Sequence, residues 1–275
     1  MDHAVEAFGL EKSFRDVHAV KGVDLTVRAG ERVGLLGPNG AGKTTMLLML
    51  LGAITPDAGR IRVLGEDLRR HRSRAMAGVG FAAGYLPLPD RQRVREALDI
   101  YGRLYGLRET GPAIEEALER FHIPHLADRM CLELSSGQRT LVGICKAVLH
   151  KPRLLVLDEP TASLDPDVAR RVRDGLHSLN EETGTALLVT SHDMAEVERL
   201  CDRVVFVARG RVVADGAPAV VLDEFGHTSL EDLFIELARG SEDELSTELP
   251  TADVGQGPHI SEEGGPAECP PGRKQ

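Results

Sequence analysis

A glycine-rich stretch, GPNGAGKTT at residues 37–45, is the first part of this chain whose residue types and spacing indicate chemistry. It fits the pattern G-x-x-x-x-G-K-[ST] between an apolar run and a helical pattern. Its glycines let successive backbone N–H groups turn toward a phosphate, and the following helix N-terminus adds positive potential. We expect Lys43 to contact the β- and γ-phosphates of a nucleoside triphosphate and the Thr44 hydroxyl to ligate Mg²⁺. The residues expected to bind nucleotide here are Gly37, Pro38, Asn39, Gly40, Ala41, Gly42, Lys43, Thr44 and Thr45.

Two adjacent carboxylates, Asp158 and Glu159, follow the apolar run LLVL at residues 154–157. In a parallel sheet, ligands bind at the edge where such strands end. We expect Asp158 to hold Mg²⁺, directly or through water, and Glu159 to orient and deprotonate an attacking water molecule. A few residues later, Asp165 and Pro166 are typical of a helix start, with aspartate at the N-cap and proline at the first helical position.

The sequence TSH at residues 190–192 follows another apolar run, ALLV. This placement predicts that His192 lies at the same edge of the sheet as Asp158, where it is able to donate a hydrogen bond to a γ-phosphate. The alternative is a structural or simply exposed histidine, and position alone does not decide between the two.

Strand and helix patterns surround these motifs. Near-alternating apolar residues with glycine breaks predict strands within residues 3–36, a helix is expected at 42–51, and another strand at 59–68. Three helical patterns without a convincing strand occupy about residues 84–152. From residue 153 strands alternate with helices, which implies a parallel sheet covered on both faces. We therefore expect an α/β nucleotide-binding core interrupted by a helical insert.

The composition narrows the possible partners and compartments. The chain has 33 Lys+Arg against 43 Asp+Glu, a formal net charge of −10 that argues against a basic nucleic-acid-binding surface. The four cysteines are scattered without a CxxC pair, as in a reduced cytosolic protein. We expect no signal peptide, and the longest apolar run, MLLMLLGAI, is too short to span a membrane. Residues 240–275 are acidic and rich in Gly and Pro, and are expected to form a disordered tail that is either solubilising or, alternatively, regulatory or partner-binding.

Four segments in the same order resemble the ATP-binding subunit of ABC transporters: GPNGAGKTT, LSSGQ, LLVLDEP with SLD, and SH. The resemblance covers about residues 4–239, and the signature motif at 134–138 makes it highly specific. The finer pattern, including MAEVERLCDRVVFVARGRVVADG, resembles the ATPases of ABC-2 type exporters. The resemblance implies a P-loop NTPase (RecA-like) core with a parallel sheet, an N-terminal antiparallel β subdomain and an inserted helical subdomain.

The ATPase domain is expected to span residues 1–239. We expect its core at about 1–83 and 153–225, its helical subdomain at about 84–152 and a C-terminal helix at about 228–239. That last helix places four apolar residues on one face, for packing on its own domain or, alternatively, for a dimer or partner contact. These residues are Leu230, Leu233, Phe234 and Leu237.

The resemblance assigns roles to further residues. Phe14 stands where the family has an aromatic residue that stacks on adenine, although the residue by itself would be expected in the core. Ser135, Gly137 and Gln138 match the signature loop, and Asp165 matches the aspartate that communicates between the two sites of a dimer. Because family members form head-to-tail dimers, the resemblance implies that the signature loop closes over ATP held by the opposite subunit. The implied catalytic residues are Lys43, Glu159 and His192, and the implied Mg²⁺ ligands are Thr44 and Asp158.

The implied function is ATP binding and hydrolysis by a transporter subunit, with ATP and Mg²⁺ as cofactors. The implied partners are a separately encoded integral membrane permease and a second ATPase subunit, as a homodimer or, alternatively, a heterodimer, with no nucleic acid. The chain is then peripheral, at the cytoplasmic face of the membrane. The 27 Arg against 6 Lys favour a GC-rich bacterial genome. The transported substrate is not predicted, because substrate contacts lie mostly in the permease.

Two positions depart from the family pattern. The signature motif has Ser136 where the commonest form has glycine, and this small side chain is expected to preserve the loop. Family members also carry a glutamine at the junction of core and insert, whereas the corresponding position here is Gly84 or Tyr85. Gln92 lies about eight residues from that slot. The missing amide either slows turnover or changes coupling.

Three arginines follow this junction. Arg91, Arg93 and Arg95 either meet an acidic patch on the partner or form a solvated face. Two alternative functions also stay open. A non-transport ABC ATPase bound to DNA or ribosomes needs a long insert or two such domains, and the insert here is only about seventy residues. An ATP-sensing module with little hydrolysis is favoured by the missing glutamine and disfavoured by Glu159 and His192.

Overall fold

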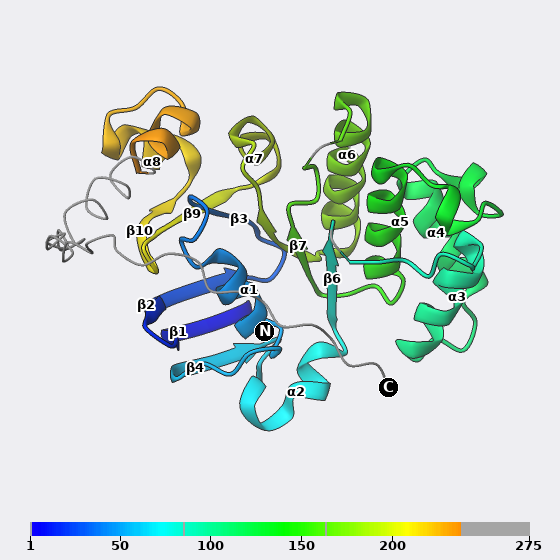
Figure 1. Ribbon diagram of the computed structural model, residues 1–275, viewed down its shortest axis with the longest axis horizontal. Coiled ribbons are helices and arrows are strands. Elements are labelled where there is room, and N and C mark those ends of the chain that lie inside the picture. Colours follow the sequence, from blue (N-terminus) through cyan, green and yellow to red (C-terminus); the bar gives the residue numbers. More distant parts are fainter. Residues whose placement is uncertain (1, 85, 163, 238–275) are drawn as a thin grey trace, which may run out of the picture.

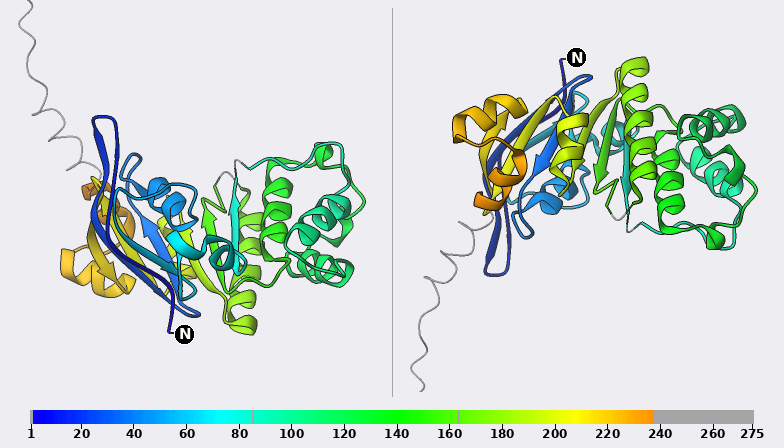
Figure 2. Two further views of the ribbon diagram at one scale, coloured as in Figure 1. Left: turned by 90° about the horizontal axis from the view of Figure 1, so that it is seen from below. Right: turned by 90° about the horizontal axis from the view of Figure 1, so that it is seen from above.

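The computed structural model describes residues 2–84, 86–162 and 164–237. Within these ranges the chain forms two sheets surrounded by helices, with a separate group of helices at one end of the molecule (Figures 1 and 2). Tyr85 and the tail expected at residues 240–275 lie outside the described residues.

The smaller sheet is four-stranded and antiparallel, with the order β2-β1-β4-β5. Its strands are β1 (His3–Phe14), β2 (Val17–Arg28), β4 (Ala58–Val63) and β5 (Glu66–Asp67). In β2, alternate residues Val23, Leu25 and Val27 point into the core, as expected for a sheet with one buried face. The expected antiparallel N-terminal β subdomain is confirmed.

The larger sheet is six-stranded, with the order β10-β9-β3-β8-β7-β6. Its strands are β3 (Arg32–Leu36), β6 (Val79–Ala83), β7 (Leu154–Asp158), β8 (Ala186–Thr190), β9 (Arg203–Ala208) and β10 (Arg211–Gly216). The strands pair in parallel, except that β10 runs antiparallel to β9 at one edge. Every residue of β7 and β8 is buried, because helices or the smaller sheet cover both faces.

Five helices between Lys43 and Phe225 belong to the core. They are α1 (Lys43–Leu50), α2 (Leu68–Met76), α6 (Pro166–Thr183), α7 (Met194–Leu200) and α8 (Pro218–Phe225). Helix α1 lies between the two sheets, where Met46, Leu47, Met49 and Leu50 share one apolar cluster with strands of both (Figure 1). This all-round burial anchors the helix that follows the glycine-rich loop.

The insert contains α3 (Val94–Leu104), α4 (Gly111–Arg120) and α5 (Ser136–Val148), with short 3₁₀ turns at Pro124–Leu126 and Cys131–Glu133. It lies beyond β6 at one end of the molecule (Figures 1 and 2). Its described residues contain no strand, apart from an isolated bridge between Arg93 and Met130. The three helices thus occupy the segments where the sequence predicts them.

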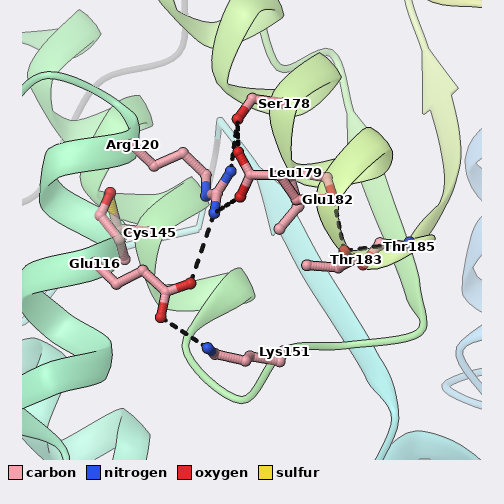
Figure 3. A network of polar contacts seen from close by, with 10 residues as sticks. Glu116, Arg120, Cys145, Lys151, Ser178, Leu179, Glu182, Thr183 and Thr185 are labelled. Carbon is pink, nitrogen blue, oxygen red and sulfur yellow. Dashed lines mark hydrogen bonds and ion pairs between the residues drawn. The ribbon is translucent and has the colours of Figure 1, made fainter.

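Polar contacts tie the insert to the core between α4 and α6 (Figure 3). The Arg120 guanidinium donates to the Glu182 carboxylate at 2.7 Å and to the Ser178 hydroxyl at 2.8 Å. Next to them, the Phe121 ring packs so closely on Gly175 that a Cβ on this glycine would lie 2.6 Å from ring atoms. The apolar cores of the two parts are continuous.

The sequence patterns miss four elements: α2, β6, β10 and α8. In α2 only Leu68 and Ala75 are buried, so no apolar period marks the helix. Strand β10 is a half-exposed edge strand.

The C-terminal helix occupies residues 230–237, where Leu230 and Leu233 are buried in the domain's own core, as expected for a helix that packs on its own domain. None of the described helices combines the length and the apolar character that a membrane span requires.

Candidate nucleotide-binding and catalytic site

Three neighbouring strands of the larger sheet end at one edge, and each leads into a predicted motif. β3 leads into the glycine-rich loop at residues 37–45, β7 ends in Asp158 followed by Glu159, and β8 leads into His192. Because β3, β8 and β7 are adjacent and parallel, these motifs share the carboxyl edge of the sheet. The topology brings these residues together, and their chemical roles stay predictions.

Two glycines fix the path of the loop backbone. Gly37 has a φ of 145°, and a Cβ there would lie 2.0 Å from the carbonyl oxygen of Val207. Gly42 has a φ of 106°, and a Cβ there would lie 2.5 Å from the carbonyl oxygen of Ala19. Both conformations are rare for residues with a side chain. The loop is therefore held between β2 and β9 in a shape that requires glycine at both positions.

Helix α1 begins at Lys43 without a side-chain cap and without an acidic residue in its first turn. Its first backbone N–H groups thus lack both an intrahelical acceptor and a competing carboxylate. Gly40, at the exposed side of the loop, has a φ of 79° and nothing within 4 Å of the position of a Cβ. Open space beside unpaired donors at the positive end of a helix dipole suits an anionic phosphate group.

The Lys43 ammonium folds back over the loop. Its Nζ donates to the carbonyl oxygens of Gly37 at 2.5 Å and Pro38 at 3.1 Å. Burial lowers the pKa of Lys43 below its usual value, while the nearby carboxylates of Glu159 and Asp158 act in the opposite direction. The lysine therefore shares one electrostatic environment with the two predicted catalytic carboxylates, although they come from a different strand.

A residue that the sequence patterns did not single out contacts both acidic residues, Asp158 through its carboxylate and Glu159 through its backbone. The Thr190 hydroxyl donates to Oδ1 of Asp158 at 2.6 Å and accepts from the backbone N–H of Glu159 at 3.0 Å. Thr190 is fully buried and stands directly opposite Asp158 in the register of β8 and β7. The sequence places Thr190 at the strand end, but only the register reveals its partners.

His192 lies against Glu159. Its Nδ1 is 2.7 Å from Oε2 of Glu159, and its backbone N–H donates to the same oxygen at 3.3 Å. The His192 side chain is 66 % exposed and the Glu159 side chain 32 %. The histidine is therefore neither isolated nor a core residue. It contacts the predicted catalytic carboxylate, while its predicted contact with a γ-phosphate stays a prediction.

Phe14 is exposed, at 44 % of its maximum. This exposure corrects the interpretation of Phe14 as a core residue, because the hairpin between β1 and β2 projects beyond the packed sheets at this point. Phe14 pairs with Val17, and two residues further along β2 the carbonyl of Ala19 lies against Gly42. The aromatic ring is thus exposed on the hairpin whose strand β2 contacts the phosphate loop, and the Lys12 ammonium lies 5.5 Å from the ring centroid.

The signature loop begins α5 with a reciprocal capping box. The backbone N–H of Gln138 donates to the Ser135 hydroxyl at 3.3 Å, and the backbone N–H of Ser135 donates to the Gln138 side-chain oxygen at 3.1 Å. Ser135, Gly137 and Gln138 line a pocket of about 290 Å³ together with Asp165, and no residue of the phosphate loop lines it. Asp165 takes the N-cap position of α6 without making a side-chain capping hydrogen bond. The motif that the sequence links to ATP therefore lies apart from the phosphate loop of its own chain.

The junction lacking the family glutamine follows β6. Ala83 pairs with Asp158, so Gly84 lies one residue beyond the strand that flanks the acidic pair. Gln92 instead helps to line a pocket of about 570 Å³ that is formed entirely by residues 92–127 of the insert. This position agrees with the expectation that Gln92 lies too close to the insert helix to fill the slot of the missing amide.

Two of the three arginines after the junction are engaged within the chain. Arg95 pairs with the Asp128 carboxylate at 2.8 Å, and Arg93 donates to the Asp128 carbonyl. Arg91 is exposed. Arg93 and Arg95 are exposed as well, so a contact with an acidic patch of a partner and a solvated face both stay open for all three arginines.

The residues of this edge fit a magnesium ion brought in with a nucleotide. Among the residues that the structure describes, no three His, Cys, Asp or Glu side chains lie together as a metal site. Mg²⁺ at nucleotide sites usually takes one or two protein oxygens plus phosphate oxygens and water. The exposed Thr44 hydroxyl is one such donor. Oδ2 of Asp158, to which no described residue donates, is another.

Comparison with known proteins adds an independent observation. Residues 20–162 match the family model described as ABC transporter. The Nod factor export ATP-binding protein I of a Rhizobium species is 38 % identical over 244 residues, covering 88 % of this chain and 79 % of that protein. The protein of the same name from Burkholderia lata is 40 % identical over 225 residues, covering 81 % of this chain and 74 % of that protein.

The fold has a counterpart among solved structures. A structure described as the ATP-binding subunit of an ABC transporter superposes with a TM-score of 0.78 and 27 % sequence identity, covering 85 % of this chain and 99 % of that one.

Proposed function

The chain belongs to the ABC transporter family as an ATP-binding and ATP-hydrolysing domain, and from this membership we propose that it drives a separately encoded membrane permease as a peripheral subunit. The observation that carries the proposal is the placement of Lys43, Asp158 and Glu159 at one edge of the sheet, beyond the ends of β3 and β7, which lie on either side of β8. This arrangement supports ATP hydrolysis, and not ATP binding alone, as the working activity of the subunit.

We assign the chemistry to side chains of this edge. The N–H groups of the loop at residues 37–45 and the Lys43 ammonium stabilise the charge on the transferring phosphoryl group. Glu159 orients the attacking water and accepts its proton, and His192 holds the Glu159 carboxylate in place. Mg²⁺, held by Thr44 and Asp158, neutralises phosphate charge when it is bound.

We propose that two copies of the chain associate head to tail. Support comes from the signature pocket with Ser135, Gly137, Gln138 and Asp165, which contains no residue of the phosphate loop of its own chain. In such a dimer, each ATP molecule binds between the phosphate loop of one subunit and the signature loop of the other. Each loop thus supplies half of a binding site. To shift the ratio of closed to open dimer from 1:99 to 99:1, ATP has to stabilise the closed dimer relative to the open one by about 5.5 kcal/mol.

The direction of transport is proposed from the relatives. The two similar proteins are named as export ATP-binding proteins, so we propose that this chain serves an exporter of the ABC-2 type, at the cytoplasmic face of a bacterial membrane. Residues 1–239 form the ATPase unit in this proposal, with Phe14 stacking on adenine.

The transport role is tested by purification of the full chain from its own membrane fraction, which is expected to recover an integral membrane protein. Recovery of ribosomes or DNA alone contradicts a transport role.

Substitution of the predicted base tests the hydrolytic assignment. In Glu159→Gln the side chain keeps its size but accepts no proton, so turnover is expected to fall by about 10²- to 10⁴-fold while ATP still binds. Glu181→Gln, at an exposed glutamate on α6, is the matched control. If wild type and Glu159→Gln show the same low, residual turnover, the catalytic assignment is contradicted and the ATP-sensing alternative is favoured.

A further inference from the structure

The last residue of β8 is bonded to both predicted catalytic carboxylate residues. The Thr190 hydroxyl donates to Oδ1 of Asp158 at 2.6 Å and accepts from the N–H of Glu159 at 3.0 Å. The Thr190 carbonyl accepts from that same N–H at 3.2 Å. One buried residue thus fixes the side chain of Asp158 and the backbone of Glu159.

These contacts restrain Asp158 in a particular way. The Asp158 side chain is largely buried, and a buried carboxylate that accepts a charge-assisted hydrogen bond holds its rotamer more firmly than one without a donor. Because the bond is made to Oδ1, the other carboxylate oxygen keeps its lone pairs for a further partner. The direction in which Oδ2 points is therefore set by a hydroxyl on the neighbouring strand.

Glu159 has a strained backbone that the same residue stabilises. Its φ of 53° lies in the left-handed region, which is costly for a residue with a side chain. Both acceptors of its N–H belong to Thr190. This backbone turn directs the Glu159 side chain toward His192, which lies two residues after Thr190 and contacts the carboxylate. The end of β8 thus sets the orientation of both acidic side chains.

We propose that Thr190 is a positioning residue for ATP hydrolysis, which aligns Oδ2 of Asp158 toward Mg²⁺ and the Glu159 carboxylate toward the attacking water. This inference rests on the proposed function. The Thr190 hydroxyl aligns both acidic side chains. Its removal therefore impairs the catalytic step and the part of nucleotide binding that depends on Mg²⁺. Contacts made by the phosphate loop without magnesium are not affected.

The chain offers a matched control at the other end of the same strand. Thr185 directly precedes β8 and is 1 % exposed. Its hydroxyl donates to the carbonyl of Pro152 at 2.7 Å and shares a hydrogen bond with the Thr183 hydroxyl at 2.7 Å (Figure 3). Thr185→Val therefore removes a buried hydroxyl with two partners, as Thr190→Val does, but far along the strand from the carboxylates.

The experiment compares Thr190→Val, Thr190→Ser and Thr185→Val in the full chain with wild type. For Thr190→Val we expect kcat to fall at least about tenfold, while the affinity for ATP without Mg²⁺ changes less than about twofold. We also compare the melting temperature measured with ATP and Mg²⁺ to that measured with ATP alone. The difference between the two is expected to be smaller in Thr190→Val than in wild type. Thr190→Ser, which keeps the hydroxyl, is expected to retain more than about a third of the wild-type kcat.

The outcomes separate a positioning role from a merely structural one. If Thr185→Val loses as much kcat as Thr190→Val, the effect is a general cost of a lost buried hydroxyl and the proposal is overturned. Wild-type kcat and wild-type Mg²⁺ response in Thr190→Val overturn it as well. A loss of hydrolytic function in Glu159→Gln, measured in parallel, tests the proposed function separately, because the Mg²⁺ response of Thr190→Val depends on Asp158 and not on Glu159.

Discussion

The Nδ1 atom of His192 lies 2.7 Å from Oε2 of Glu159, and the backbone N–H of His192 donates to that same oxygen at 3.3 Å. Two contacts from one residue therefore hold a single carboxylate oxygen. Oε1 of Glu159 has no hydrogen bond to any residue that the structure describes. A carboxylate held on one side and free on the other is suited to orient a water molecule.

Loss of the imidazole is expected to impair turnover. His192→Ala removes the side chain that orients Glu159, so we expect kcat to fall by about 10²-fold with ATP affinity nearly unchanged. His177→Ala is a matched control, because Nδ1 of His177 pairs with the Glu181 carboxylate at 3.2 Å on the surface of α6. Steady-state ATPase kinetics check both variants. A similar loss in the two variants contradicts a specific role of His192.

The signature loop is expected to act on a second subunit. Ser135→Arg places a long cation at the N-terminus of α5, so we expect ATP binding by the isolated subunit to persist while dimerisation and turnover are lost. Leu104→Arg adds the same charge at a 75 % exposed position of the insert and serves as the control. Nucleotide binding and light scattering measure the two properties. Loss of ATP binding by the Ser135→Arg monomer places the signature loop in the ATP site of its own chain.

Two glycine substitutions are expected to change stability in opposite directions. In Gly175→Ala the new methyl group meets the Phe121 ring at 2.6 Å, so we expect a loss of about 1–3 kcal/mol from overpacking between α4 and α6. Gly143→Ala, in the middle of α5, meets no atom within 4 Å. There we expect a gain of roughly 0.5–1 kcal/mol, because alanine favours the helix. Denaturant unfolding measures both, and equal effects contradict the packing argument.

The contact between insert and core is expected to weaken in acid. The Arg120 guanidinium, with the Ser178 hydroxyl, lowers the pKa of Glu182 from 4.5 to about 2. Because this pKa is lower in the folded chain, the stabilisation is complete above about pH 4.5 and is lost as the pH falls toward about 2. The difference in melting temperature between wild type and Glu182→Gln is therefore expected to shrink across this range.

An exposed glutamate on α4, Glu115, provides the control for this pH dependence. Glu115→Gln removes an exposed carboxylate from the same helix as Arg120. Its difference from wild type is expected to stay nearly constant over the same acidic range, because the surface charge interactions it loses are weak. A difference between wild type and Glu182→Gln that grows as the pH falls reverses the predicted sign.

Contiguous sequence was enough to identify the chemistry. The loop at residues 37–45 carries its strand, its glycines and its helix start within one short segment, and LLVLDEP carries a buried strand with its terminal carboxylates. Such local patterns also predict the three helices of the insert and most strands of the core. They are visible in sequence because each depends on residues that follow one another along the chain.

Only the tertiary structure decided which residues act on these motifs. The pairing of Asp158 with Thr190 depends on the register of two strands that are 32 positions apart, and no local pattern encodes that register. The contact of Arg120 with Glu182 likewise depends on how the insert packs on α6. The exposure of Phe14 follows from where the hairpin ends relative to the sheets. Sequence determined which groups are present, and packing determined what each of them contacts, because sheet order and helix docking join residues that are distant along the chain.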